Sequence, residues 1–319
     1  MKIAAIIPCY NVKAFIKDVI DNIPSGCQGI YIVDDKCPQE TGEFVEEVIS
    51  DPRVKVLYSA ENQGVGGAVL TGYEAAYEDG YDIFVKIDGD GQMPPSIMAN
   101  ICEPILNRRA DYSKGNRFNS FYNVRSMPFV RLFGNSMLSF LTKLSSGYWS
   151  IFDPTHGYTA LHREAYQRLS VNNLAKRYFF ETDMLIQLRN ISAVVKDVPM
   201  EAKYGDEESG LKVRSVLLEF FTKHIRMTIR RFIYQYFLRD ISLASCHLML
   251  GLSTLLVGGG FGISLWIKSI NTGLATPTGT IMLSALPSIL GFQSIIFALG
   301  ADVASEPKTP LQNKTVPEL

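Results

Sequence analysis

Two aspartates separated by a single glycine are the residues of this chain best suited to bind a metal ion. Asp88 and Asp90 follow an apolar run of strand type at residues 82–87. Side chains alternate along an extended chain, so both carboxylates point to one side, and Gln92 would follow them there. Such oxygen ligands suit a hard divalent cation that also carries phosphate oxygens. An acidic surface turn explains the same tetrapeptide equally well, so the neighbouring segments must decide.

Further polar motifs follow predicted strands in the first part of the chain. Apolar runs at residues 2–7, 29–33 and 53–58 predict buried strands, and helical segments separate them. This alternation predicts an α/β fold with a mostly parallel sheet between helices, in which ligands bind at the carboxyl ends of the strands. The polar motifs would meet at those ends, which favours a binding site over a surface turn. They are residues 8–11, 34–35, 62–67 and 88–92.

The glycine-rich segment after the third predicted strand matches a dinucleotide-binding loop only in part. Gly64-Val65-Gly66 begins like GxGxxG, but Val69 stands at the third glycine position, and the segment does not follow the first strand. No GxxxxGK[ST] motif occurs in the sequence. These glycines are better explained by close packing of a helix on the sheet beside a bound nucleotide.

Length, charge and cysteine content exclude several classes of protein. The chain has 319 residues, enough for one large domain or two ordinary ones, and a formal net charge of −1, so we expect no nucleic-acid partner. Its five cysteines show no CxxC spacing, which argues against a disulfide framework or a zinc site and fits a reducing cytoplasm. The first apolar run is too short for a signal peptide and soon meets a proline.

The last quarter of the chain has the composition of a membrane protein. Residues 243–267 and 281–301 contain no Asp, Glu, Lys or Arg and are long enough to cross a bilayer. The basic amphipathic segment at 211–241 suits an anionic lipid surface, and the positive-inside rule predicts that both ends of the hairpin face the cytoplasm. Glycines of the first span could permit a homo-oligomer. The alternative is two long core helices of a soluble domain.

Taken in order, these motifs resemble those of family 2 glycosyltransferases, which have the GT-A nucleotide-sugar-binding fold. The two-span tail is similar to that of the polyprenyl-phosphate glycosyltransferases in this family, of the dolichol-phosphate mannose synthase type. The resemblance extends over nearly the whole chain. It is carried by IIPCYN at 6–11, VDD at 33–35, NQG at 62–64, DGDGQ at 88–92, DPTHGY at 153–158 and YGDEES at 204–209.

The resemblance implies where the sugar donor and its metal ion bind. Asp88 and Asp90, with Gln92, would hold Mg²⁺ or Mn²⁺ across the donor diphosphate, where the cation acts as Lewis acid and template. The nucleotide would lie beside the strand-end motifs. The residues expected there are Pro8, Tyr10, Asn11, Asp34, Asp35, Asn62, Asp88 and Gly89.

The resemblance also implies a site for the phosphate of the lipid acceptor. Arg117 and Arg131 match the family's basic residues there, and a guanidinium fork suits phosphate, although either could form a structural salt bridge. The acceptor phosphate is already anionic near neutral pH, since its second pKa is about 6, so alignment matters more than a general base. Asp153, Asp183 and Glu181 could orient the acceptor or the sugar, or could cap helices. The expected catalytic residues are Asp90, Asp153, Asp183, Arg117 and Arg131.

The chain departs from the family pattern in several places. Cys37 stands where many relatives have Ser, and Gly157-Tyr158-Thr159 stands where relatives of the mannose-synthase type often have Gly-Phe-Arg. The late phosphate-binding arginine is not evident, and Lys203, Lys212 or Arg214 could replace it. These differences put the identity of the sugar and the acceptor contacts in doubt. They do not affect the expected reaction class.

We therefore expect an inverting, metal-dependent glycosyltransferase that moves a hexose from a UDP- or GDP-sugar to undecaprenyl or dolichyl phosphate. The alternatives are a membrane-tethered enzyme that extends a glycan or glycolipid, and a non-catalytic nucleotide-sugar-binding subunit. The expected location is the cytoplasmic (inner) membrane, with the catalytic domain in the cytoplasm. The expected parts are a GT-A domain at 1–210, amphipathic juxtamembrane helices at 211–241, two transmembrane helices within 242–302 and a cytoplasmic tail at 303–319.

Overall fold

The computed structural model describes residues 1–118, 129–200 and 213–314, apart from the side chains of 129–133, 135 and 213–219. These residues divide into two compact units, one of Met1–Met227 with Pro307–Leu319 and one of Thr228–Glu306. Predicted features that lie outside the described residues are the side chains of Arg131 and Arg214, together with Lys203, Lys212 and the motif at 204–209.

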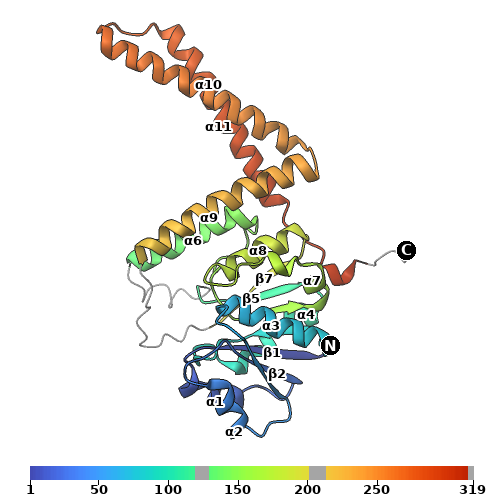
Figure 1. The fold of residues 1–319 in the computed structure, drawn as a ribbon. Coiled ribbons are helices and arrows are strands. Elements are labelled where there is room, and N and C mark those ends of the chain that lie inside the picture. Colours follow the sequence, from blue (N-terminus) through green and yellow to red (C-terminus); the bar gives the residue numbers. More distant parts are fainter. Residues whose placement is uncertain (119–128, 201–212, 315–319) are drawn as a thin grey trace. The chain divides into compact units, whose positions relative to one another are not determined.

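The first unit is built on one seven-stranded sheet with the strand order β3-β2-β1-β4-β6-β5-β7. Strands β1, β2, β5 and β7 of this sheet are labelled in Figure 1. Neighbours among β1 to β4 pair in parallel, β6 runs antiparallel to both β4 and β5, and β7 is parallel to β5. The prediction of a mostly parallel α/β sheet is confirmed. The strands are β1 (Ile3–Cys9), β2 (Gly29–Asp34), β3 (Val54–Tyr58), β4 (Ile83–Lys86), β5 (Tyr112–Asn116), β6 (Thr159–His162) and β7 (Val195–Pro199).

Helices pack on both faces of this sheet and form two separate hydrophobic cores. Alternate residues of β1 enter different cores, since Ile6 packs in one with helix α3 and Ile7 packs in the other with helix α1. A strand that is buried on both faces has no solvent-facing positions, which explains its continuous apolar run. The helices of this unit are α1 (Lys13–Asp21), α2 (Thr41–Val48), α3 (Val65–Glu78), α4 (Met98–Leu106), α6 (Phe129–Ser146), α7 (Arg163–Arg168) and α8 (Phe180–Asn190).

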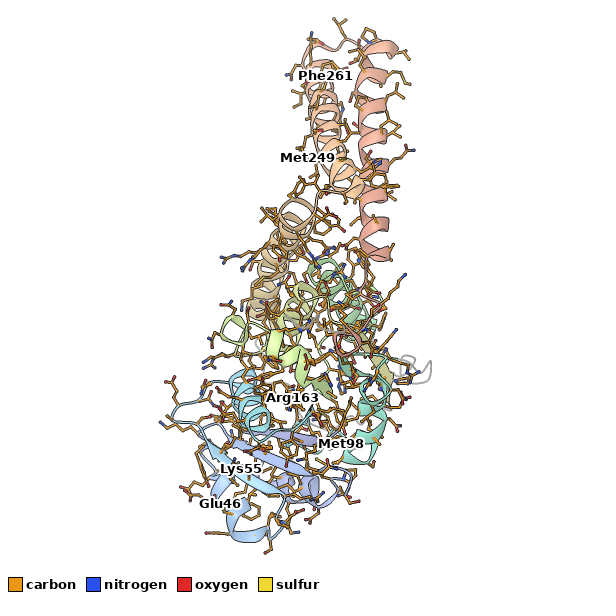
Figure 2. The ribbon with its side chains drawn as sticks, turned by 90° about the vertical axis from the view of Figure 1, so that its right-hand side faces the viewer. Glu46, Lys55, Met98, Arg163, Met249 and Phe261 are labelled. Carbon is orange, nitrogen blue, oxygen red and sulfur yellow. The ribbon has the colours of Figure 1, made fainter. Side chains whose placement is uncertain are left out.

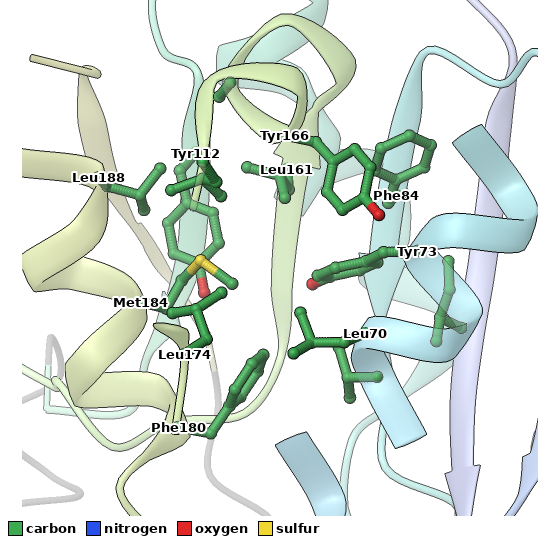
Figure 3. Close-up of a cluster of buried hydrophobic side chains, with 14 of the residues drawn as sticks. Leu70, Tyr73, Phe84, Tyr112, Leu161, Tyr166, Leu174, Phe180, Met184 and Leu188 are labelled. Atoms are coloured by element: carbon green, nitrogen blue, oxygen red, sulfur yellow. The ribbon is translucent and has the colours of Figure 1, made fainter. Parts of the chain in front are cut away.

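One of the two cores is rich in aromatic side chains (Figure 3). The ring centroid of Phe84 on β4 lies 5.7 Å from that of Tyr73 on α3 and 5.5 Å from that of Tyr166 on α7. Phe180, the first residue of α8, is buried in the same cluster. Aromatic pairs add about 0.5–1.5 kcal/mol each beyond the area they bury. The cluster therefore fixes α3 and α8 on the sheet, together with the loops that precede both helices.

Strand β6 directly follows the motif at 153–158, and the sequence shows no strand pattern there. The strand has only four residues, and all of them are buried, so it is too short to show an alternating pattern. In the sheet, Thr159 of β6 pairs with Lys86 of β4. This pairing brings Gly157, just before β6, beside the carboxyl end of β4.

The second unit contains two helices that are long and apolar enough to cross a membrane. They are α10 (Leu243–Thr272) and α11 (Thr278–Ala304), each with an 18-residue stretch of mean hydropathy 1.8, and they confirm the two apolar C-terminal helices expected from the sequence. Large side chains on α10 remain exposed, among them Leu256 at 74 %. Met249 and Phe261 project from the same helix (Figure 2).

Close helix contact and one buried ion pair hold the second unit together. A Cβ on Gly251 would lie 2.9 Å from the carbonyl oxygen of Gly291, so only glycine allows α10 and α11 to approach this closely. Arg231 donates two hydrogen bonds to the carboxylate of Asp302, at 2.7 and 2.9 Å, and the Tyr236 hydroxyl donates a third at 2.7 Å. The helical segments before the hairpin are α9 (Val213–Ile233) and a π-helical turn at Tyr234–Arg239.

Residues that follow the hairpin pack on the first unit. Leu311 is buried in the aromatic core, and its N–H donates a hydrogen bond to Asp111 Oδ1 at 2.8 Å. The other oxygen of Asp111 accepts from the N–H of Val194, and Gln312 Nε2 donates to the carbonyl oxygen of Ala110. The segment Leu311–Asn313 is therefore part of the first unit.

Candidate functional site

A cavity of about 370 Å³ opens at the carboxyl ends of β1 and β4, beside the residues that follow β2. Strand-end motifs that are far apart in the sequence meet here, as expected of a parallel sheet. Most of the predicted nucleotide and metal residues line this cavity, but Asn11, Asp34 and Gln92 do not. The lining residues are Pro8, Cys9, Tyr10, Val12, Asp35, Asn62, Gly64, Val65, Ala68, Asp88, Gly89, Asp90, Arg177 and Tyr178.

Left-handed backbone conformations shape the loops around the cavity. Gly64 has a φ of +85°, and a Cβ there would lie 2.8 Å from the carbonyl oxygen of Lys176. Gly91, directly after Asp90, has a φ of +77°. Asn11 also has a positive φ, 59°, which asparagine tolerates better than most residues. Asn11 therefore shapes the turn after β1, even though its side chain is not part of the cavity lining.

Asp34, at the end of β2, has a structural role in this conformation. Its Oδ1 accepts a hydrogen bond from the N–H of Cys37 and its Oδ2 accepts one from the N–H of Gly42, both at 2.7 Å. The residue is 4 % exposed. The carboxylate therefore fixes the loop that follows β2 and the first turn of α2, rather than lying in the cavity.

Asp35 joins the end of β2 to the loop that follows β3. Its two carboxylate oxygens accept hydrogen bonds from the N–H groups of Gln63, at 2.9 Å, and Gly64, at 2.7 Å. The side chain of Asn62 donates to the backbone carbonyl of Asp35 at 3.2 Å. Asp35, Asn62 and Gly64 all line the cavity, so this carboxylate holds a part of the cavity wall in place.

Asp88 is paired with a buried lysine that sequence reasoning missed. Lys86, the last residue of β4, is 1 % exposed, and its Nζ lies 2.9 Å from Asp88 Oδ1 and 3.0 Å from Glu181 Oε1. Burial opposes the charged ammonium, but the carboxylates of Asp88 and Glu181 outweigh it and raise the pKa of Lys86. A lysine within an otherwise apolar strand was the signal that could have identified it.

The carboxylates at the end of β4 fit a divalent cation that is shared with a phosphate ligand. Asp90 lines the cavity with Asp88, and its Oδ1 accepts a hydrogen bond from the N–H of Gln92 at 3.0 Å. Among the described residues, no group of three or more His, Cys, Asp or Glu side chains is arranged to hold a metal ion by itself. Mg²⁺ is commonly held by one or two carboxylates together with substrate phosphates, which matches this donor set.

Arg117 and Asp153, predicted as separate catalytic residues, are paired with each other. Nε and Nη2 of Arg117 donate to the two oxygens of Asp153 at 2.8 and 3.1 Å. Asp153 is almost fully buried, and although burial favours its neutral form, the hydrogen bonds from Arg117 lower its pKa. Neither residue is part of the cavity lining. The geometry indicates that Asp153 orients the guanidinium of Arg117.

More ionisable groups lie beside this pair. Lys114 on β5 donates from Nζ to the carbonyl oxygen of Pro154 at 2.7 Å, and burial lowers its pKa to about 8. Asp197 on β7 accepts from the N–H of Phe152, and burial raises its pKa to about 6. These contacts hold the segment before β6, which includes Asp153, against β5 and β7.

Asp183 supports a loop that forms part of the cavity wall. Its Oδ2 accepts a hydrogen bond from the N–H of Ala175 at 2.8 Å, and the residue is buried in the first turn of α8. The supported loop supplies Arg177 and Tyr178 to the cavity. Sequence reasoning missed both residues, although a basic and aromatic pair just before the helix that carries Glu181 was a usable signal. Asp183 itself is not part of the cavity lining.

A second cavity, of about 540 Å³, shares Arg177 and Tyr178 with the first. Basic and aromatic side chains predominate in its wall, a combination that suits an anionic group attached to an apolar chain. The remaining lining residues are Glu61, Gln63, Ala175, Lys176, Phe179, Phe220 and Lys223.

Comparison with known proteins identifies relatives of this chain. The family model described as Glycosyl transferase family 2 matches residues 4–170. The UDP-N-acetylglucosamine–dolichyl-phosphate N-acetylglucosaminyltransferase of Methanococcus voltae is 33 % identical over 215 residues, which cover 63 % of this chain and 85 % of that one. The dolichol-phosphate mannosyltransferase of Pyrococcus furiosus is 27 % identical over 280 residues, which cover 86 % of this chain and 74 % of that one.

The fold also resembles that of a solved structure. Glucosyl-3-phosphoglycerate synthase from Mycobacterium tuberculosis, in complex with Mn²⁺, uridine diphosphate and phosphoglyceric acid, has a TM-score of 0.53 with this chain. The sequence identity is 18 %, and the match covers 72 % of this chain and 78 % of that chain. The likeness concerns the fold alone and confirms the predicted GT-A architecture.

Proposed function

The chain belongs to glycosyl transferase family 2, and on that premise we propose that it transfers a hexose from a UDP- or GDP-sugar to a polyprenyl phosphate. The observation that carries the proposal is the cavity at the strand ends, where Asp88 and Asp90 meet the loop held by Asp35. The relatives from Methanococcus voltae and Pyrococcus furiosus are both named for transfer to dolichyl lipids, which supports the acceptor class.

The sugar donor binds in the cavity of about 370 Å³. Tyr10 is 49 % exposed there, so its ring is available to stack on the nucleotide base. The loop held by Asp35 forms the neighbouring wall. A bound Mg²⁺ or Mn²⁺ neutralises charge that develops on the departing nucleoside diphosphate, and Asp88 and Asp90 are the residues that hold it.

The chemical step needs alignment more than a strong base. An oxygen of the acceptor phosphate forms a bond to the anomeric carbon as the bond from that carbon to the diphosphate oxygen breaks, and the nucleoside diphosphate leaves with the electron pair. Attack from the opposite side inverts the anomeric configuration. The acceptor is already anionic near neutral pH, because its second pKa is about 6. Bringing the two reacting atoms together therefore supplies most of the acceleration.

Cationic side chains orient the acceptor phosphate. Arg117, whose guanidinium is held by Asp153, is one of them. Arg177 is another, because it lines both the donor cavity and the neighbouring basic and aromatic cavity. Asp183 contributes through the loop that carries Arg177. The apolar side chains of the second cavity, such as Phe179, suit the prenyl chain next to the phosphate.

The two apolar helices anchor the enzyme in the cytoplasmic membrane. On α9, exposed Ile225 and Ile229 alternate with exposed Arg226 and Arg230, a combination that suits the interface with anionic lipids. The cationic residues precede the first span, so the positive-inside rule puts the catalytic domain in the cytoplasm. There it meets both the soluble sugar donor and the phosphate of the lipid acceptor.

A transfer assay tests the proposed function. Full-length protein in detergent is incubated with labelled UDP- and GDP-sugars, undecaprenyl or dolichyl phosphate, and Mn²⁺. One donor is expected to give an acid-labile glycosyl phosphate lipid, and the product is expected to disappear in EDTA.

Two other results would contradict the proposal. An acid-stable product would instead support extension of a glycan or glycolipid. Donor binding without any product, from every donor and acceptor combination, would support a non-catalytic nucleotide-sugar-binding subunit.

A further inference from the structure

Lys86 is a fully buried lysine that forms ion pairs with carboxylates from two distant parts of the chain. Asp88 follows β4 directly, whereas Glu181 belongs to the first turn of α8. A buried ion pair is generally no more stable than well-packed apolar residues of similar volume. Lys86 is therefore poorly explained by stability alone, and its position beside the metal-binding carboxylates points to a functional reason.

The two oxygens of Asp88 have different surroundings. Oδ1 is buried and lies 2.9 Å from Nζ of Lys86. Oδ2 faces Gly157, where an added Cβ would lie 2.8 Å from this oxygen and 2.5 Å from the ammonium nitrogen. The side chain of Asp88 as a whole is 30 % exposed. One oxygen is thus fixed from inside the protein, and the absence of a side chain at Gly157 allows the other oxygen and the ammonium to keep their positions.

We propose that Lys86 is a positioning residue that fixes Asp88 as a one-oxygen ligand of the divalent cation, with Oδ1 held by the ammonium and Oδ2 directed to the metal. This inference rests on the proposed function. Gly157 is the second part of the arrangement, since any larger residue there would displace Oδ2 or the ammonium. Neighbouring groups that orient a metal ligand commonly change metal affinity by about 10–100-fold when they are lost.

Lys86 also offsets part of the negative charge that Asp88, Asp90 and Glu181 carry when ionised. The ammonium also lies between Asp88 and Glu181, so the two carboxylates are separated by a group that attracts both.

Binding of Mn²⁺ and UDP to the detergent-solubilised full-length protein tests this role without relying on turnover. Lys86→Met is expected to raise the Kd for Mn²⁺, measured by electron paramagnetic resonance in the presence of UDP, by about 10-fold or more. In the transfer assay, the Mn²⁺ concentration for half-maximal rate is expected to rise by the same factor. Unchanged Mn²⁺ affinity in folded Lys86→Met would overturn the proposal and leave a structural ion pair.

Two further variants distinguish a loss of Asp88 positioning from a change in net charge and from a loss of folded protein. Lys86→Met with Glu181→Gln removes one charge of each sign, so it should fold at least as well as the single variant while its Mn²⁺ affinity stays low. Recovery of wild-type affinity in this double variant would overturn the positioning role. Gly157→Ala keeps both charges, and it is expected to weaken Mn²⁺ binding because its methyl group meets Oδ2 of Asp88. Wild-type affinity in folded Gly157→Ala would contradict the one-oxygen arrangement.

Lys114→Met is the matched control for removal of a buried lysine. Lys114, on β5, is also fully buried, but its Nζ donates a hydrogen bond to the backbone carbonyl of Pro154. Its substitution is expected to affect thermal stability and to leave Mn²⁺ affinity unchanged. If the wild-type protein itself showed no effect of Mn²⁺ on the binding of either UDP or GDP, the proposed function would fail. Normal wild-type binding with an unaffected Lys86→Met would overturn only the role of Lys86.

Discussion

Two aspartates lie at the end of β2 and two at the end of β4, but the two pairs have different hydrogen-bond and ion-pair partners. At the end of β2, every carboxylate oxygen of Asp34 and Asp35 accepts a hydrogen bond from a backbone N–H. At the end of β4, Asp88 is instead held by a lysine side chain, and Asp90 Oδ1 accepts a hydrogen bond from the N–H of Gln92. Aspartates whose oxygens all accept backbone hydrogen bonds fix loops. Partly exposed aspartates near the lysine ammonium can still bind a ligand.

The largest expected effect is at the end of β4. Asp88→Asn removes the charge that we propose binds the cation and leaves Lys86 with one carboxylate partner, so the rate of sugar transfer should fall by about 10²–10³-fold. Labelled-sugar transfer at saturating donor measures the effect, with circular dichroism as the control for folding. A folded Asp88→Asn enzyme that keeps more than one tenth of the wild-type rate would show that the aspartates after β4 are no more important for transfer than those after β2.

An intermediate effect is expected for Asp35, which holds a loop in place and also lines the cavity proposed to bind the donor. An asparagine has a single acceptor oxygen, so Asp35→Asn leaves the N–H of Gln63 or Gly64 without its bond and loosens that wall of the cavity. A loss worth about 1.5 kcal/mol corresponds to a roughly tenfold higher KM for the donor. The kcat is expected to change much less, and a fall in kcat with an unchanged KM would show that Asp35 acts in the chemical step.

The smallest effect on transfer is expected for Asp34. Asp34→Asn loses one of the two bonds to Cys37 and Gly42 and should lower the free energy of unfolding by about 1–3 kcal/mol. Thermal or urea unfolding measures this loss, and kcat per folded molecule should stay at the wild-type value. Loss of activity in a fully folded Asp34→Asn protein would put this residue in the site itself.

A pH experiment tests a buried histidine near the end of β4, the strand end that carries Asp88 and Asp90. His156, next to Gly157, is buried, and its Nδ1 accepts a hydrogen bond from the N–H of Tyr158; burial lowers its pKa to about 3. A histidine in an unfolded chain has a pKa of about 6.5. As the pH falls below that value, the unfolded chain therefore binds a proton at this histidine, whereas the folded protein does not. Stability from this residue is therefore present above pH 6.5 and is lost towards pH 3.

The expected size of this effect is about 2 kcal/mol between pH 7 and pH 5. Because other carboxylates titrate in the same range, the measured quantity is the difference between wild type and His156→Asn, whose side-chain oxygen can still accept from Tyr158. Wild type should lose about 2 kcal/mol more than the variant. An equal loss in both proteins would mean that His156 is protonated in the folded state.

Local sequence patterns predicted which strand ends form the site, but not which side chains bond to one another there. Continuous apolar runs identify β1 and β2, because a strand buried on both faces leaves no position for a polar residue. The same rule fails for β6, whose four residues are too few to show a pattern. Convergence of the polar strand ends also followed from the sequence, since parallel strands present their carboxyl ends at one edge.

The roles of individual carboxylates could not be predicted in this way. Asp34 and Asp88 occupy equivalent places in the sequence pattern, and only the folded chain shows which one meets backbone N–H groups and which one meets Lys86. The contact of Lys86 with Glu181 joins residues 95 positions apart. The bidentate pairing of Arg117 with Asp153 depends on tertiary structure for the same reason.

Nucleotide binding with and without metal tests the central claim most directly. Titration of UDP and GDP into the full-length protein, in Mn²⁺ and in EDTA, is compared between wild type, Asp88→Asn and Asp34→Asn. Wild type and Asp34→Asn should bind one of the nucleotides at least about tenfold more tightly in Mn²⁺, whereas Asp88→Asn should show no effect of the metal. A metal effect that survives in Asp88→Asn and is lost in Asp34→Asn would contradict the account.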